Sequence, residues 1–409
     1  MAKPQVLIMA TLDTKDEETI YVREVLQAQG VKALIIDCGS LGTPPPVADI
    51  TREQVARRAG VELAELVATG DKGHIIGTMG RGLSLIVEDM HRAGELQGVI
   101  GLGGGQGTAM GTGAMQSLPL GFPKVMATTL AAGNMRPFLG TKDIAVFPSV
   151  ADILGMNFIL RRTLYNAALC LAAMVLQPAP QDRPPGVVIG ATAFGVVTAG
   201  LLKLRKLLVG PKLEMAFFHA NGMGGASMDE LAAQGAFDAI LHWSTHEITE
   251  RMAGGIFQAR PEHLDVLAEK RLPCLVSMGA VDYFCMGPHL ELTEEWKKRR
   301  NYIVHNRNIT LVRANAEEMV GAAGFLAAKL NKALGPVKVM VPLKGFSEPN
   351  AKGKQFYDPE TDAQFLEALE RQLDGRIDII KLDSHINSDE FVAEAAKEMR
   401  AMLAAEAIA

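Results

Sequence analysis

A run of glycines carries the clearest chemical signal in the chain. Gly101 to Thr108 read Gly-Leu-Gly-Gly-Gly-Gln-Gly-Thr, after the apolar run Val99–Leu102 and before a helical pattern that starts near Ala109. Glycines let backbone N–H groups approach a phosphate closely, and the start of a helix adds positive potential there. The loop lacks the Gly-Lys-Ser/Thr of a Walker A motif and does not match GxGxxG. It therefore favours phosphate or nucleotide binding without a known motif, with a tight turn as the alternative. The candidate residues are Gly103, Gly104, Gly105, Gln106, Gly107 and Thr108.

Polar residues also follow the other strands that we expect in this half. Asp13, Thr14 and Lys15 come after the first strand, where a hydroxyl and an ammonium suit phosphates and a carboxylate suits Mg²⁺ or a ribose. Asp37 to Ser40 follows the second strand, where a carboxylate suits ribose hydroxyls, and Arg81 follows the third. Ligands of open α/β sheets bind outside the carboxyl ends of the strands, so these residues indicate one site. Taken singly, each could be a turn or cap residue.

The second half has a comparable set of polar residues after its expected strands. The candidate catalytic residues are His219, His246, Glu247, Asp282 and His385. Histidine and carboxylates are the usual general acids and bases near neutral pH. Loop hydrogen bonds and caps are the alternative. The spacing of His242, His246 and Glu247 could bind a divalent metal, but it is not HExxH, and we assign no metal site from it.

The elements that must position these residues alternate along the chain. In the first half, the runs 6–10, 33–37, 74–77, 99–102 and 124–128 read as strands, and in the second half so do 187–191, 214–218, 238–241, 274–277, 337–341 and 377–382. Several are apolar throughout, as parallel strands covered on both faces are. Helical patterns such as Asp16–Gln29, with a capping box from Thr14 to Glu17, and Ser388–Ala405 separate them. The pattern predicts an α/β fold with two doubly wound, mostly parallel Rossmann-like domains in tandem.

The proline-rich segment 177–186 predicts the domain boundary, giving a nucleotide-binding domain at 1–180 and a substrate or partner domain at 181–409. A net charge of -5 argues against nucleic acid as a partner. The apolar run Ala167–Leu176 is short of the ~20 residues that a membrane span needs, so we expect no membrane partner. The four cysteines show no CxxC pair and no spacing typical of a disulfide framework, so we expect buried, reduced thiols. Reduced thiols predict a cytoplasmic protein.

Several longer segments together resemble the ATP-binding domain family of the tomato mosaic virus resistance protein Tm-one. The matching segments are 11–15, 100–108, 118–125 and 147–153 in the first half, and 218–225, 277–282, 356–359 and 385–387 in the second. The resemblance covers essentially the whole chain. It implies two α/β domains, ATP bound in the first domain and a homodimer. By position, it implies that Asp13, Thr14, Lys15, Ser40, Lys72 and the segment from Gly104 to Thr108 contact the nucleotide.

The chain departs from this family in its second half. His242 to Glu247 reads His-Trp-Ser-Thr-His-Glu where members have Asp-x-Thr-Thr-Thr-Glu, and Asn221 stands where Thr is usual. These changes leave the first domain intact and put in doubt what the second domain binds.

The functional hypothesis is a small-molecule ATP-dependent transferase or kinase-like enzyme. ATP with Mg²⁺ would lie on the first domain, and the substrate would lie at the domain interface. One alternative is a non-catalytic, nucleotide-responsive module that binds another protein. Another is a metal-dependent hydrolase or lyase centred on the second domain.

Overall fold

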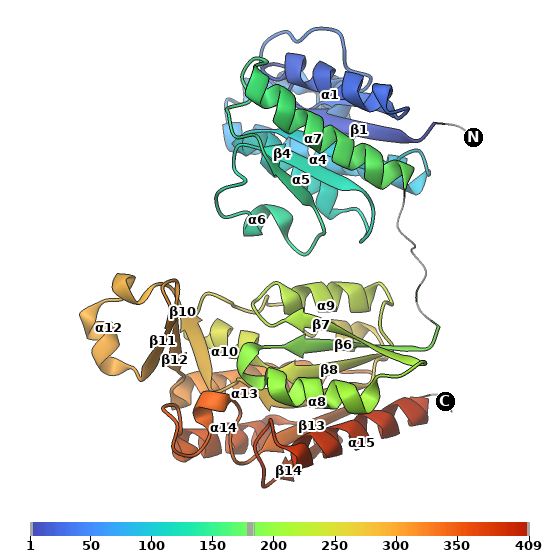
Figure 1. Cartoon of the computed structure of the whole chain (residues 1–409). Helices are drawn as coiled ribbons and strands as arrows, with labels where there is room; N and C mark the ends of the chain where they lie inside the picture. Colours follow the sequence, from blue (N-terminus) through green and yellow to red (C-terminus); the bar gives the residue numbers. More distant parts are fainter. Residues whose placement is uncertain (1–2, 178–182, 184, 407–409) are drawn as a thin grey trace. The chain divides into compact units, whose positions relative to one another are not determined.

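The computed structural model describes residues 3–177, 183 and 185–406. The chain forms two compact units, Met1–Asp182 and Arg183–Ala409, called here the first and second units. Most of the predicted proline-rich boundary, residues 178–182 and 184, lies outside the described residues. Each unit is built around its own parallel sheet (Figure 1).

The first unit contains a five-stranded sheet in the order β2-β1-β3-β4-β5, and every neighbouring pair is parallel. Ile8 at the centre of β1 lies beside Ile35 of β2 and Ile100 of β3. The strands are β1 (Gln5–Ala10), β2 (Lys32–Asp37), β3 (Gly98–Gly103), β4 (Lys124–Thr128) and β5 (Ala145–Pro148). Strand β5 was not predicted from the sequence.

Helices cover both faces of this sheet because successive strand residues point to opposite sides. Ile8 and Ile100 pack under α1 and α7, which lie side by side on one face (Figure 1). Leu7 and Val99 pack under α2 to α5 on the other face. The helices are α1 (Asp16–Ala28), α2 (Arg52–Arg58), α3 (Leu63–Ala68), α4 (Lys72–Arg92), α5 (Gly105–Gln116), α6 (Arg136–Leu139) and α7 (Phe158–Leu176).

Helix α7 is long and apolar enough to cross a membrane by length and composition alone. Its buried face, which includes Leu160, Leu164 and Leu171, belongs to the core of the first unit. This is the behaviour of a core helix in a globular domain.

The predicted strand at residues 74–77 is wrong, because these residues belong to helix α4. Asp71 begins this helix by accepting a hydrogen bond from the His74 amide at 3.0 Å. Ile75, Met79 and Leu83 then recur at helical spacing and are buried. Among the glycines that looked like a loop, Gly82 serves helix packing, since a Cβ there would lie 2.1 Å from the Val55 carbonyl oxygen of α2. The predicted capping box of α1 is also absent: Lys15 is the N-cap and makes no side-chain cap bond.

The second unit contains a six-stranded parallel sheet in the order β14-β13-β9-β8-β6-β7. The strands are β6 (Val187–Ala193), β7 (Leu213–His219), β8 (Ala239–Ser244), β9 (Cys274–Gly279), β13 (Val337–Pro342) and β14 (Asp378–Leu382). The unit also contains a three-stranded antiparallel sheet in the order β10-β12-β11, which was not predicted from the sequence. It consists of β10 (Tyr283–Met286), β11 (Tyr302–Asn306) and β12 (Ile309–Arg313).

Two helical layers again sandwich the parallel sheet. One core contains Ile240 and Val276 with residues of α9 to α11, α13 and α14, and the other contains Leu241 and Trp243 with residues of α8 and α15. The helices are α8 (Thr198–Leu208), α9 (Gly224–Ala233), α10 (His246–Ala253), α11 (Val266–Glu269), α12 (Glu294–Arg299), α13 (Ala316–Leu330), α14 (Pro359–Gln372) and α15 (Asp389–Glu406).

Both parallel sheets reverse their strand order between the first and third strands of the unit. In the first unit this switch point lies between β1 and β3, and in the second between β6 and β8. Adjacent helices diverge at such a point and open a crevice at the carboxyl ends of the two strands. The fold therefore has one expected ligand position in each unit.

Candidate functional site

The glycine loop of the first unit lies at the β1–β3 switch point. Helix α5 starts at Gly105, and within the described residues no side chain caps its first amides. Gly103 and Gly107 are required by packing, since a Cβ on Gly107 would lie 2.8 Å from the Leu102 carbonyl oxygen. By contrast, a Cβ on Gly105 would meet nothing within 4 Å. Nothing inside the fold demands glycine there, so close approach by a ligand is a reason for it.

A depression at this switch point brings together several of the predicted nucleotide residues. Asp13, Ser40 and Gln106 line it, although it encloses only about 10 Å³. The Leu41 amide donates to Asp13 Oδ2 at 3.1 Å and so holds the carboxylate in place. A ligand would therefore lie across this edge of the sheet rather than inside it.

A larger pocket of about 400 Å³ continues the same edge beyond β4 and β5. Thr128, Thr129, Ser149 and Asp152 are among its lining residues. A Cβ on Gly104 would lie 3.6 Å from the Thr129 hydroxyl, so the glycine loop lies beside this pocket. The edge thus offers polar groups on both sides of the loop.

Other residues predicted for the nucleotide site line neither this depression nor this pocket. Thr14 is exposed and donates to Asp13 Oδ1 at 3.3 Å, Lys15 lies at the start of α1, and Lys72 is the first residue of α4. The Thr108 side chain is buried, bonded to the Gly104 carbonyl and the Thr128 hydroxyl at 2.7 and 2.6 Å.

Two charged residues have partners elsewhere. Arg81 donates to the Ala59 carbonyl oxygen at 3.0 Å, and the strand that was to place it at the site does not exist. Asp37, which the sequence offered for a ribose, is buried and accepts from Arg52 at 2.8 Å. Asp37 therefore stabilises the loop after β2.

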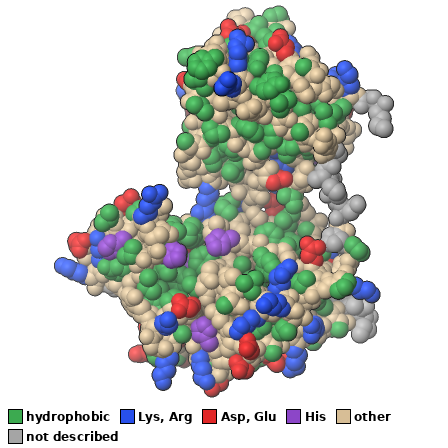
Figure 2. Space-filling model, viewed as in Figure 1, with side chains coloured by type: hydrophobic (Ala, Val, Ile, Leu, Met, Phe, Trp, Pro, Cys, Tyr) green, Lys and Arg blue, Asp and Glu red, His purple; other side chains and the backbone are tan. Residues whose placement is uncertain are grey.

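The second unit has a pocket of about 440 Å³ beside its own switch point, called here the second-unit pocket. Its lining includes Phe194, His219, Phe257, Tyr283, Cys285 and His305. Figure 2 shows histidines at the surface of the second unit next to hydrophobic side chains. The pocket is thus largely apolar with a few polar groups, as small-molecule sites usually are.

Phe194 connects two of the predicted catalytic histidines. Its ring stacks on His246 with centroids 4.0 Å apart and on His219 with centroids 5.1 Å apart. Partial burial, followed by the nearby His246, lowers the pKa of His219. His219 is thereby favoured in its neutral form, which can accept a proton.

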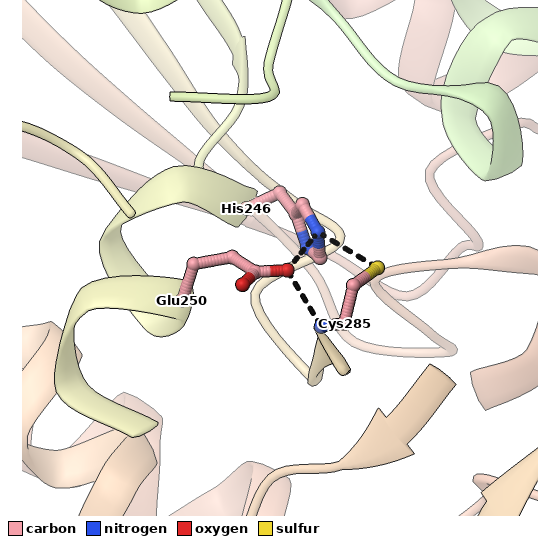
Figure 3. Close-up of side chains that lie close together, drawn as sticks. All are labelled: His246, Glu250 and Cys285. Atoms are coloured by element: carbon pink, nitrogen blue, oxygen red, sulfur yellow. Dashed lines mark hydrogen bonds and ion pairs between the residues drawn. The ribbon is translucent and has the colours of Figure 1, made fainter. Parts of the chain in front are cut away.

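His246 converges with two residues that the sequence analysis did not select (Figure 3). Its Nε2 lies 2.9 Å from Glu250 Oε1 and 3.6 Å from Cys285 Sγ. All three side chains are buried, and their ligand-type atoms lie within 4.8 Å of one another. Burial, followed by Glu250, raises the pKa of the Cys285 thiol. We call these residues the His246–Glu250–Cys285 triad.

Tyr283 adds an unsatisfied polar group to the pocket lining. Its ring is fully buried 4.7 Å from the His246 ring, and its hydroxyl has no hydrogen-bond partner within the described part of the chain. Burial raises the pKa of Tyr283 well above its usual value, so the hydroxyl stays protonated. A buried donor without a partner is costly, and a bound molecule would satisfy it.

Glu247 lies away from His246 and holds a glycine loop. Its Oε1 accepts from the amides of Gly222 and Gly225 at the start of α9, the second of these at 3.1 Å. The Asn221 side-chain oxygen accepts from the two amides between them, those of Met223 and Gly224, at 3.2 and 3.3 Å. Burial raises the pKa of Glu247. The chain's own carboxylate therefore occupies the position that an anion would take at this helix.

His242 belongs to a buried network on the opposite face of the sheet from Trp243, and this network extends to Glu247, whose Oε2 lies 4.0 Å from His263 Nε2. Its Nε2 lies 2.9 Å from His263 Nε2, and His263 Nδ1 lies 2.6 Å from Asp229 Oδ2. Burial lowers the pKa of His242 well below its usual value. The metal set of His242, His246 and Glu247 considered from the sequence is thus not assembled.

The last two predicted catalytic residues stabilise loops. Asp282 is buried and accepts from the Ser347 hydroxyl at 2.7 Å, and burial raises its pKa. His385 Nε2 donates to the Ser347 carbonyl oxygen at 2.9 Å, and its Nδ1 accepts from the Asn387 amide at 3.1 Å. These contacts use both ring nitrogens of His385, and neither residue lines the second-unit pocket.

Comparisons with known proteins place both halves of the chain in one family. Residues 4–180 match the N-terminal domain, and residues 186–403 the C-terminal domain, of an uncharacterised protein family, UPF0261. A UPF0261 protein of Clostridium tetani is 34% identical over 98% of this chain and 99% of its own length. The tomato ToMV resistance protein Tm-1(GCR237) is 35% identical over 78% of this chain and 43% of its own length.

A likeness among solved structures adds nothing to these matches. UDP-GlcNAc 2-epimerase of Methanocaldococcus jannaschii aligns over 97% of this chain and 92% of its own at 10% identity, with a TM-score of 0.23. Such a score carries no argument about function. On the strength of its two domain matches and its full-length relatives, the chain belongs to the uncharacterised protein family UPF0261.

Proposed function

We propose that the first unit binds ATP with Mg²⁺ across the carboxyl edge of its sheet. The observation that carries this proposal is the uncapped start of α5 at the β1–β3 switch point. The two glycine-rich helix starts differ in this respect. The side chains of Glu247 and Asn221 accept hydrogen bonds from the amides at the start of α9. No described side chain does so at the start of α5, so its amides can bind a ligand. Helix amides and a positive helix end favour a phosphate group.

Individual residues have distinct roles in this proposal. The amides of Gly105 and Gln106 would bind phosphate oxygens, and Lys15 would add a positive charge. Asp13 would hold Mg²⁺ or a ribose, because among the described residues its Oδ1 accepts only from the exposed Thr14 hydroxyl. The pocket beside Thr129 would take the remainder of the nucleotide. The polar groups on either side of the glycine loop support this arrangement.

We further propose that the protein is an ATP-dependent transferase or kinase-like enzyme whose small-molecule substrate occupies the second-unit pocket. His219 is its candidate general base, because it lines the pocket and is favoured in its neutral form. The family resemblance supports a homodimer as the working form.

Calorimetric titration of MgATP into the full-length protein tests the nucleotide proposal. The test variant is Gly105→Val and the matched control is Gly113→Val. Both glycines lie on α5, and at neither position would a new Cβ have a neighbouring atom within 4 Å. We expect wild type and Gly113→Val to bind equally, and Gly105→Val to bind at least about tenfold more weakly, a loss of about 1.4 kcal/mol. Absence of binding to wild type, or equal binding by both variants, would refute the nucleotide site.

Phosphate release and substrate screening test the enzymatic part separately. Loss of turnover in His219→Gln with unchanged MgATP affinity would support the assigned role. MgATP binding without turnover on any substrate would instead favour the nucleotide-responsive binding module.

A further inference from the structure

We propose that the second unit binds a divalent transition-metal ion of the zinc class through His246 Nε2, the Glu250 carboxylate and Cys285 Sγ. The site lies beside the second-unit pocket and is independent of the nucleotide proposal. Among the described residues, this triad is a group whose nitrogen, oxygen and sulfur ligand atoms converge within 4.8 Å. Figure 3 shows the three side chains pointing toward one another from α10 and β10.

The hydrogen bonds of the triad require a proton or a metal ion between His246 Nε2 and Glu250 Oε1. His246 Nδ1 lies 3.2 Å from the Ala280 carbonyl oxygen, which can only accept, so Nδ1 carries a hydrogen. Neutral His246 then presents the Nε2 lone pair to Glu250 Oε1, which also only accepts when ionised. Two lone pairs at 2.9 Å repel unless a proton or a metal ion lies between them. The nearby thiol favours the metal, since thiolate is a strong zinc ligand.

The surroundings hold the three ligands as the outer shell of a metal site does. Metal-bound histidines usually donate their other N–H to a carbonyl or carboxylate, as His246 does to Ala280. Ala280 has a φ of 57°, a left-handed conformation that costs energy in a residue other than glycine. Glu250 is fixed by the Cys285 amide at 2.6 Å and the Phe257 amide at 3.0 Å.

The spacing and charge of the triad suit zinc. Zinc–nitrogen and zinc–sulfur bonds at a tetrahedral angle put the two ligand atoms about 3.5 Å apart, close to the 3.6 Å between Nε2 and Sγ. The carboxylate would move back from Nε2 by about 0.4 Å. One carboxylate and one thiolate balance the charge of a divalent ion. This mixed ligand set also disfavours Mg²⁺ and Ca²⁺, which prefer oxygen ligands.

Three protein ligands leave one tetrahedral position for another molecule, which is the pattern of catalytic rather than structural zinc sites. Cys285 and Tyr283 both line the second-unit pocket. The Tyr283 ring lies 4.7 Å from the His246 ring, and its buried hydroxyl, without a partner among the described residues, can donate to a water or a small molecule enclosed at the fourth position. This second, independent observation also indicates a ligand at this place.

Cobalt and zinc binding by the full-length protein test the proposal. We expect the purified wild type to retain about one zinc ion per chain, and its Co²⁺ form to show a thiolate-to-cobalt charge-transfer band. Cys285→Ser should abolish that band and weaken Zn²⁺ affinity by more than about 100-fold, beyond the usual effect of altering an outer-shell group. Glu250→Gln should weaken Zn²⁺ binding without removing the band.

The matched control is Cys274→Ser, which alters another buried cysteine of the same unit outside the triad. It should keep the band and the zinc content. The wild-type measurement needs no folded variant: no zinc retained and no charge-transfer band on adding Co²⁺ would overturn the proposal, leaving a proton shared between His246 and Glu250. Equal metal binding by wild type and a folded Cys285→Ser would also overturn it.

Discussion

Phe194 and His246 stack with ring centroids 4.0 Å apart and an interplanar angle of 27°. Phe194 directly follows β6, and His246 begins α10 after β8, so the contact joins the loops on either side of the second unit's switch point. The same phenyl ring lines the second-unit pocket. The stack thus links a buried histidine to a side chain that lines the pocket.

Phe194→Leu should therefore affect both stability and the neighbouring histidine. We expect the free energy of unfolding to fall by about 1–2 kcal/mol in urea titrations, because the two histidine stacks, two further aromatic contacts and some buried area are lost. The pKa of His219 should rise toward its usual value, since packing against Phe194 contributes to its burial, and NMR titration would measure it.

The control for this prediction is Phe217→Leu. Phe217 lies on β7 with 39% of its surface exposed, so its replacement should change stability by less than about 0.5 kcal/mol. A similar loss in both variants, with no change in the His219 pKa, would show that the stack has no special role.

Glu247 and Gly225 should show strong energetic coupling. A Cβ on Gly225 would lie 1.9 Å from Glu247 Oε2, so Gly225→Ala should cost about 1–3 kcal/mol through overpacking. Glu247→Ala should also cost about 1–3 kcal/mol, because it leaves the Gly222 and Gly225 amides without their acceptor. In the double variant the clash disappears, so the combined loss should be at least about 0.5 kcal/mol smaller than the sum.

Gly375→Ala serves as the control for this cycle, since its Cβ would meet nothing within 4 Å. Combined with Glu247→Ala, it should add within about 0.5 kcal/mol. Strict additivity of Gly225→Ala and Glu247→Ala in denaturant unfolding would contradict the packing described for this loop.

The parallel strands and their carboxyl ends could be predicted because buried strands leave a simple signal. Ten of the eleven predicted strands lie on observed ones, from Val6–Ala10 in β1 to Ile377–Leu382 in β14. Strand ends in a parallel sheet share one edge, so the region of the glycine loop followed from sequence. The segment 74–77 failed because it lies in helix α4, whose glycines look like loop residues, although one of them, Gly82, is needed for the contact with α2.

The side-chain arrangement of the second unit was harder to predict. Glu247 and Glu250 are three residues apart on α10, yet one binds the α9 amides and the other approaches His246. The i, i+4 spacing of His246 and Glu250 was a readable signal that the sequence analysis missed. Cys285 lies on β10 of the small antiparallel sheet, whose strands were also missed. Its approach to His246 depends on tertiary structure and leaves no local pattern.

The buried carboxyl of Asp362 should make the stability of the second unit depend on pH. Asp362 Oδ1 accepts from Arg313 Nη2 at 2.5 Å, and its Oδ2 accepts from the side-chain Nδ2 of Asn350 at 3.0 Å. Burial raises the pKa of Asp362 from 3.8 to about 7, although the Arg313 guanidinium opposes the shift. The folded state thus holds a proton that the unfolded chain releases near pH 4.

A raised folded-state pKa of an acid contributes stability that is complete below the unfolded pKa and is lost as the pH rises through the folded pKa. Between about pH 4 and pH 7, this group should lower the free energy of unfolding by up to about 1.4 kcal/mol per pH unit. Asp362→Asn cannot titrate, so its stability should fall less steeply over that range in urea titrations at successive pH values. Exposed Glu360, two residues away on α14, provides the control. Glu360→Gln should follow the wild-type profile, and a profile for Asp362→Asn parallel to wild type would show that Asp362 is already ionised at pH 5 in the folded protein.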